Sequence, residues 1–89
     1  MPVISMFYGV VVRMFFFDTK QHNLPHIHVS YQGENAVVEI PTGKLLDGIL
    51  PKKKLKLVQV WIDLHEEELM ADWELAVNGE KIFPIDPIK

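Results

Sequence analysis

The sequence predicts an α+β domain, in which an antiparallel sheet of four to five strands is covered on one face by one long carboxy-terminal helix. In the first half, stretches that alternate or are rich in β-branched and aromatic residues are separated by turn signals, which is typical of strands. Residues 52–77 contain no Gly or Pro and keep their apolar residues on one helical face. With 89 residues the chain has room for a single domain, residues 1–89.

The expected sheet consists of two hairpins and one short strand. Tyr8-Gly9 joins the first pair of strands, and Gly33-Glu34 provides a two-residue turn with glycine first for the second pair. A polar loop, residues 18–25, connects the hairpins, and residues 80–89 form an extended tail that could add an edge strand. The expected strands are residues 3–7, 10–17, 26–31, 36–40 and 44–46.

The expected helix begins after Pro51 and ends at Asn78-Gly79, a left-handed cap. A continuous helix over residues 52–77 would be about 39 Å long at 1.5 Å per residue, whereas a globule of this size is about 25 to 30 Å wide. The helix must therefore either break near Asp63, where Asp63-x-x-Glu66 forms a capping box, or project and pack on a second chain. A buried strand within residues 57–64 is a third possibility, since that segment is apolar almost all round.

Composition limits the kinds of site and the compartment. Nine Lys and Arg residues face twelve Asp and Glu residues, which gives a net charge of −3, and there is no cysteine. Any metal must therefore be held by histidine and carboxylate, and a cytoplasmic location fits a chain without disulfides. The apolar start, residues 1–17, contains only Arg13 as a charge, but it lacks the pattern of a signal peptide or of a spanning helix, so no membrane association is expected.

Three of the four histidines, His22, His26 and His28, lie within seven residues. On a strand that begins at residue 26, the side chains of His26 and His28 share one face while the intervening residues turn to the core. A turn at Gly33-Glu34 would place His28 opposite Glu39, with β-carbons about 5 Å apart. Two imidazoles and one carboxylate are then expected to converge on one patch of the sheet, with His22 arriving from the loop.

This patch suits a metal ion or an anion. The candidate ligands for a divalent transition metal, zinc first, are His22, His26, His28 and Glu39. Without a metal, a histidine beside a carboxylate could act as a general acid, or the pair could hold a phosphate with help from Arg13. The His26-x-His28 spacing is also typical of a solvent-exposed strand face without a ligand, with Glu39 as an ordinary cross-strand partner. His65, on the apolar stripe of the helix, is expected to be a hydrogen-bonded core histidine, with a fourth metal ligand as the alternative.

Charge is unevenly distributed along the expected helix. Lys52, Lys53, Lys54 and Lys56 crowd its start, and acidic residues dominate its second half. The lysines next to free helix amides form a candidate anion-binding site, although the net charge of −3 disfavours nucleic acid. Halves of opposite sign also favour antiparallel self-association, so a homodimer is possible.

The segment Pro25-His26-Ile27-His28, together with Pro2-Val3-Ile4 and the helix around Trp61, His65, Leu69 and Trp73, resembles the small bacterial proteins of domain of unknown function 4160. The resemblance covers most of the chain. It implies a partner, a small protein encoded by a neighbouring gene, and a regulatory role like that of toxin–antitoxin pairs.

Two functions follow as hypotheses. The first is a binding or regulatory module with a histidine-rich surface site on the hairpin. The second is a histidine-dependent hydrolase or nuclease, with or without metal, acting on a phosphate-containing substrate. The sequence leaves open whether the protein is an enzyme.

Overall fold

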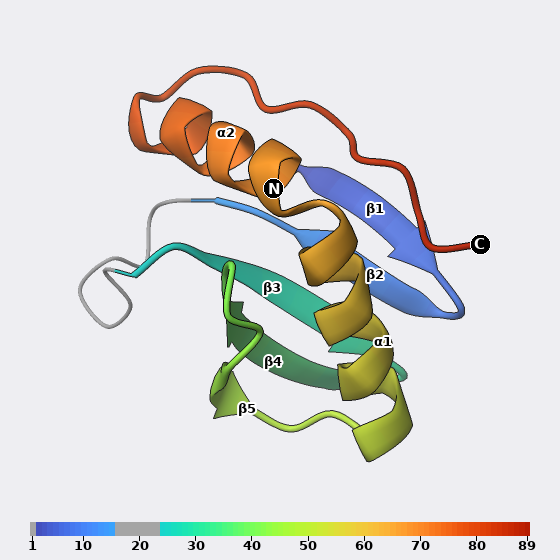
Figure 1. Ribbon diagram of the computed structural model, residues 1–89. Coiled ribbons are helices and arrows are strands. Elements are labelled where there is room, and N and C mark those ends of the chain that lie inside the picture. The colour runs from blue at the N-terminus through green and yellow to red at the C-terminus, as the bar shows by residue number, and fades with distance from the viewer. Residues whose placement is uncertain (1, 16–23) are drawn as a thin grey trace.

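The computed structural model describes residues 2–15 and 24–89, in which one antiparallel sheet of five strands packs against two helices (Figure 1). The strands follow chain order across the sheet, and each pairs with the next. The α+β class and the antiparallel sheet are therefore confirmed. The strands are β1 (Val3–Phe7), β2 (Val10–Arg13), β3 (His26–Tyr31), β4 (Glu34–Glu39) and β5 (Leu45–Gly48), and the helices are α1 (Lys52–Leu64) and α2 (Glu66–Val77).

Both hairpin turns are built from residues with positive φ. Tyr8-Gly9, as expected, joins β1 to β2, with φ of 50° and 81°. The second turn is Gln32-Gly33, with φ of 45° and 83°, and the expected turn at Gly33-Glu34 is wrong. Two successive residues with positive φ give the primed turn whose twist matches that of paired strands, and glycine takes the second position in both cases.

The shifted turn changes the pairing of β3 with β4 by two positions. His26, not His28, lies opposite Glu39, and His28 lies opposite Val37. Because the side-chain period of a strand is two residues, a shift of two leaves every side chain on its expected face. Ile27 and Val29 therefore face the core as predicted, while the cross-strand partners were not predicted correctly.

The single long helix is also wrong, because the chain breaks at His65 into α1 and α2. His65 has φ −121° and ψ 28°, outside the helical region, and no side chain caps α2, so the Asp63-x-x-Glu66 capping box does not form. An unbroken helix of about 39 Å would exceed the longest dimension of the molecule, 33 Å. Residues 57–64 are helical, which excludes the strand reading. Neither α1 nor α2 is long and apolar enough to cross a lipid bilayer.

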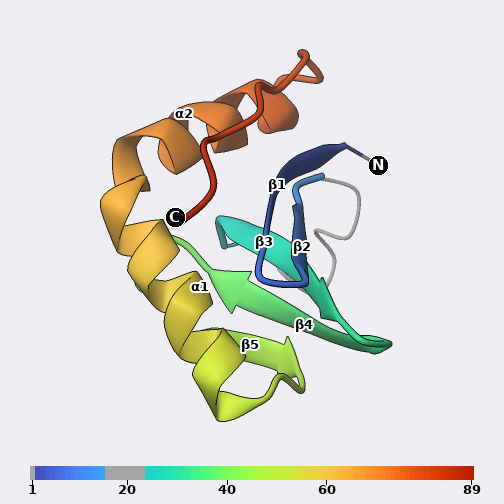
Figure 2. The ribbon, with the colours of Figure 1, turned by 90° about the vertical axis from the view of Figure 1, so that its right-hand side faces the viewer.

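The core lies between the sheet and α1. Trp61 is fully buried, and its ring lies 5.4 Å from that of Phe7 in β1. Ile27 and Val29 of β3 face the same core, together with Val58 of α1. Burial of such side chains supplies most of the folding free energy, about 1.5 to 3 kcal/mol for each large aliphatic or aromatic one. α1 therefore covers one face of the sheet, and α2 turns away toward the end of the sheet (Figure 2).

Residues 80–89, the C-terminal strap, run back across the molecule as an extended segment (Figure 1). They form no strand, so the possible edge strand is wrong, but they are attached to three elements. Two isoleucines of the strap, Ile82 and Ile85, are buried in the core. The three attaching hydrogen bonds run from Phe83 N to Asp72 Oδ1 in α2 (3.0 Å), from Ile85 N to Ile4 O in β1 (2.7 Å), and from Trp61 Nε1 in α1 to Asp86 O (2.8 Å).

Candidate functional site

The face of the sheet opposite α1 carries a polar cluster, and no described helix covers it (Figure 2). Since Ile27 and Val29 face the core, alternation along β3 places His28 and Ser30 on this open face. Arg13 of β2 lies directly opposite His28, and its Nη1 donates a hydrogen bond of 3.3 Å to Ser30 Oγ.

A hydrogen-bonded chain extends this cluster into β4. The Ser30 hydroxyl donates to Asn35 Oδ1 over 3.0 Å, and the two residues lie opposite each other in the ladder. We call Arg13, His28, Ser30 and Asn35 the open-face cluster. Because the members lie on three neighbouring strands, the sheet fixes their relative positions.

The ring of His28 is held by stacking. It lies 4.1 Å from the ring of Phe15, with an angle of only 13° between their planes. Phe15 directly follows the buried Met14 at the end of β2, and both Phe15 and His28 are half-buried. The stacking holds the imidazole on the face of the sheet that Arg13 shares, since Arg13 lies opposite His28 in the ladder.

A hollow of about 180 Å³ adjoins His28 on the open face. Gly48 is one of the residues that line the hollow. It has φ +82°, and a Cβ added there would collide with the backbone of Asn35 and Ala36, so only glycine fits. Asp47 supplies an acidic side chain at the β5 side of the hollow, opposite Val37 in the ladder. The hollow thus has histidine on one side and carboxylate on the other.

His26 is fully buried and differs from His28, although the two rings are neighbours, with centroids 5.1 Å apart. Its Nδ1 lies 2.6 Å from Leu24 O, and because a carbonyl only accepts, Nδ1 must carry the proton. The ring also packs 5.0 Å from that of Trp73 in α2. The expectation that both rings lean out of the sheet together is therefore wrong for His26, because α2 covers the end of the sheet where β3 begins.

The predicted metal ligands are not brought together in the part of the chain that the structure describes. Glu39 lies opposite His26, but its Oε1 accepts a hydrogen bond of 2.8 Å from Thr42. Among the described residues no three His, Asp or Glu side chains are close enough to hold a metal ion. His22 lies outside the described residues, so the zinc site stays a prediction from the sequence, and no chemistry is derived from it.

Among the lysines at the start of α1, Lys54 makes contacts within the protein, and the anion-binding site expected there stays a prediction. Lys54 Nζ donates to Tyr8 O over 3.2 Å and lies 5.0 Å from the centre of the Tyr31 ring, so it fastens α1 to both hairpin regions. The amide groups of Lys54 and Leu55 donate to Pro51 O. Lys52 and Lys53 are exposed.

His65 occupies the corner between α1 and α2 and is not a core residue. Its side chain is 18% exposed, its Nδ1 lies 2.7 Å from Glu68 Oε1, and its ring lies 5.7 Å from that of Trp61. It is hydrogen-bonded, as expected, but at the surface of the corner. The bond to Glu68 in the first turn of α2 fixes the direction in which α2 leaves.

Asp72 is a buried carboxyl that the sequence did not single out. It is 3% exposed, one oxygen accepts the Phe83 N–H, and Oδ2 has no hydrogen-bond partner among the described residues. Burial raises the pKa of this carboxyl, the nearby charge of Glu68 acts in the same direction, and the Phe83 N–H opposes both. Its position three residues after Leu69, on the buried side of α2, was the signal available in the sequence.

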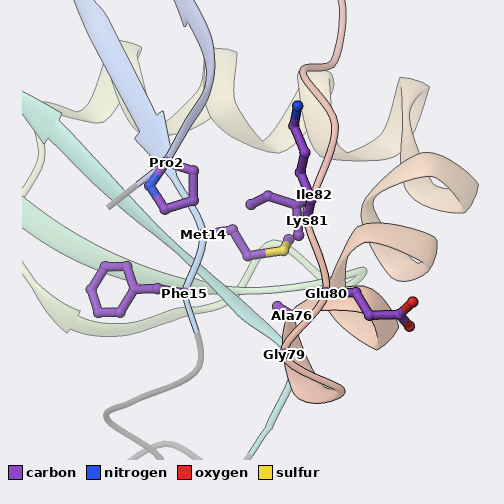
Figure 3. A pocket seen from close by; sticks show the side chains of 8 residues that line it. All are labelled: Pro2, Met14, Phe15, Ala76, Gly79, Glu80, Lys81 and Ile82. Carbon is purple, nitrogen blue, oxygen red and sulfur yellow. The ribbon is translucent and has the colours of Figure 1, made fainter.

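A second hollow, of about 320 Å³, lies between the end of β2 and the turn from α2 to the C-terminal strap (Figure 3). Met14 and Ile82 point toward each other across it, while the charged ends of Glu80 and Lys81 point away. A hollow without an inward polar group offers nothing to orient a ligand. We assign it no function.

Comparison with known families identifies the group to which the chain is related. The model of a domain of unknown function (DUF4160) matches residues 9–74, well over half of the chain. The chain belongs to the DUF4160 family. The family resemblance noted in the sequence is therefore confirmed, and the DUF4160 match includes the whole open-face cluster while β1 and the C-terminal strap lie outside it. No curated protein and no solved structure matches the chain.

Proposed function

We propose that the protein is a small binding module that holds an anionic group, a phosphoryl or carboxylate group, on the open-face cluster. One observation carries the proposal: Arg13 and His28 lie directly opposite each other on the uncovered face, with Ser30 within hydrogen-bond distance of the guanidinium. Guanidinium, imidazole and hydroxyl groups are the donors that oxyanions select, and Arg offers five N–H groups in a planar fork.

The charges around the cluster favour a small anion over a polyanion. Among the described residues Arg13 forms one side-chain hydrogen bond, from Nη1 to the neutral Ser30 hydroxyl, and no ion pair. Asp47 and Glu39, however, belong to the same half of the sheet as the hollow and would repel an extended phosphate backbone. Together with the net charge of −3, this arrangement supports a compact ligand and not a nucleic acid.

The geometry supports binding more than hydrolysis. The Ser30 hydroxyl donates to Asn35, an amide that cannot take up its proton, and buried His26 donates through Nδ1 to a backbone carbonyl. A serine nucleophile needs a histidine or similar base within hydrogen-bond distance. We therefore propose binding, and the experiment below includes a result that would instead indicate a hydrolase or nuclease. A regulatory role and a partner encoded by a neighbouring gene belong to the proposal on the strength of the family resemblance.

Titration with inorganic phosphate, followed by amide NMR shifts in ¹⁵N-labelled protein, tests the binding. Shifts should concentrate on β2, β3 and β4, and Arg13→Ala should weaken binding about tenfold or more, since a charge-assisted hydrogen bond contributes about 1.5 to 3 kcal/mol. Lys52→Ala, which removes an exposed cation of α1 on the other side of the sheet, serves as the matched control. A parallel titration with acetate distinguishes phosphoryl from carboxylate recognition.

The outcomes separate the two functions. Chemical-shift changes spread over the amides of all lysines, or an equal effect of Arg13→Ala and Lys52→Ala on binding, would overturn the proposed site. Turnover of a generic phosphodiester that disappears in His28→Ala, at unchanged thermal stability, would replace the binding module with the hydrolase.

A further inference from the structure

Helix α1 carries an apolar stripe on the side that does not face the core. The core side is made by Val58, Trp61 and Ile62, all buried. The outer stripe consists of Val60 and Leu64, which are 50% and 64% exposed, and of Leu57, which is half-buried and also packs against the edge of the core. Steps of three and four residues place the three side chains in one row along the helix.

The stripe contains a hollow with the geometry of a helix-packing hole. The hollow has a volume of about 440 Å³, and its lining includes Lys53, Lys56, Leu57 and Val60. These four residues stand at positions i, i+3, i+4 and i+7, which is the set that receives one knob side chain from a facing helix in knobs-into-holes packing. A leucine of a second helix fits such a hole.

The two ends of the stripe have opposite charges. Lys52, Lys53 and Lys56 lie at the start of α1, which has no acidic residue in its first turn. Positive charges at a helix amino terminus oppose the helix dipole, so this end gains from an acidic neighbour. At the other end, Asp63 and Glu67 are exposed at the corner with α2.

We propose that this stripe binds a second copy of the chain, with the two α1 helices antiparallel about a two-fold axis near Val60. Because the axis passes near Val60, a residue of one α1 faces the residue of the other α1 for which the two sequence numbers add to about 120. Leu64 of each copy enters the hole between Lys53, Lys56, Leu57 and Val60 of the other. The acidic end of α1 then meets the lysine end, with Asp63 opposite Lys56, and the contact is the same in both directions, as a two-fold interface requires.

Space and size fit a weak dimer. α2 turns away from the direction of α1 (Figure 2), and Val60 and Leu64 are exposed. Thirteen residues of helix are about 20 Å long, which covers less than the roughly 800 Å² per partner of a standard interface. The dimer should therefore dissociate in the micromolar range and depend on protein concentration.

Sedimentation equilibrium of the full chain from about 10 µM to about 1 mM, a range set by the expected weak affinity, tests the proposal. The expected result is a monomer–dimer equilibrium that Val60→Glu and Leu64→Glu each weaken at least tenfold. Phe83→Glu is the matched control, because Phe83 is 60% exposed but lies in the C-terminal strap. A monomer throughout this range, or a dimer that Leu64→Glu and Phe83→Glu affect equally, would overturn it.

Charge reversal tests the antiparallel direction. The variant Lys56→Glu and the variant Asp63→Lys should each be monomeric alone, because like charges then face each other. An equimolar mixture should form the heterodimer. A mixture that stays monomeric would contradict the arrangement, as would either variant dimerising as well as the wild type.

The two-fold axis allows a direct chemical test, because the chain contains no cysteine. Val60→Cys places one thiol of each copy near the axis, so mild oxidation should give a disulfide-linked dimer. Glu74→Cys, on an exposed position of α2, is the control. Equal rates of cross-linking for the two variants would overturn the proposal.

Discussion

The rings of His26 and His28 lie 5.1 Å apart at an angle of 70°, yet the two residues have different environments. His26 is fully buried against Trp73, whereas His28 stacks on Phe15 at the edge of the open face. Sequence spacing alone treats them as equivalent. The burial of His26 indicates a role in stability, and the proposed binding function places ligand contact at His28.

This difference predicts opposite effects of two alanine substitutions. His26→Ala should lower the free energy of unfolding by about 2 to 4 kcal/mol, because it opens a cavity beside Trp73 and leaves Leu24 O without its donor. His28→Ala should cost less than about 1 kcal/mol but weaken phosphate binding. Urea denaturation measures the first effect, and the NMR titration measures the second. If both substitutions destabilise the fold equally, the assignment of separate roles is wrong.

Two glycines with nearly the same φ provide a second test. Gly33 has φ +83° with nothing within 4 Å of an added Cβ, while Gly48, at φ +82°, would press that carbon into the backbone of β4. Gly33→Ala should therefore cost only the left-handed strain, about 1 to 2 kcal/mol. Gly48→Ala should cost at least about 2 kcal/mol more, since β5 must move away from β4.

Denaturation of both variants provides the comparison, with Gly33→Ala as the control for backbone strain. Amide hydrogen exchange adds the location, since faster exchange in β5 of Gly48→Ala should accompany the loss of stability. Equal destabilisation of the two variants would show that close packing at Gly48 does not contribute.

Much of the fold follows from local signals in the sequence. Tyr8-Gly9, Pro51 and Asn78-Gly79 mark a turn, a helix start and a helix end that the structure places where expected. The β3–β4 register was missed because Gln32 is not a residue typical of turns, although it adopts φ 45° here. The break at His65 has no Gly or Pro signal. A break near Asp63 was nevertheless one of the expected alternatives, because a helix over residues 52–77 is too long for a globule of this size, and the structure has the break two residues further on.

The site was predicted less completely than the fold. Arg13 and His28 were named as candidates, and the face of His28 followed from alternation. Asn35 was missed, because only the correct turn places it opposite Ser30. The burial of His26 depends on Trp73 of α2, a contact between segments far apart in the chain that spacing cannot reveal.

Asp72 gives the fold a specific pH dependence. Because burial raises the pKa of this carboxyl above its ordinary value of 3.8, its charged form is less favourable in the folded than in the unfolded state. The stabilisation by the neutral carboxyl is therefore fully present when the pH is below the ordinary pKa of 3.8, and it is lost as the pH rises through the raised pKa of the folded state. Asp72→Asn keeps an acceptor for the Phe83 N–H but cannot ionise, so it serves as the reference.

The stability of the wild type relative to Asp72→Asn should therefore increase as the pH falls from 7 toward 4. Thermal unfolding of both proteins across this range measures the difference, and other carboxyl groups cancel because both proteins contain them. Introducing Glu68→Gln into both proteins should reduce the change, since the charge of Glu68 contributes to the raised pKa of Asp72. A difference that stays constant with pH would mean that the Asp72 carboxyl ionises in the fold as readily as in water.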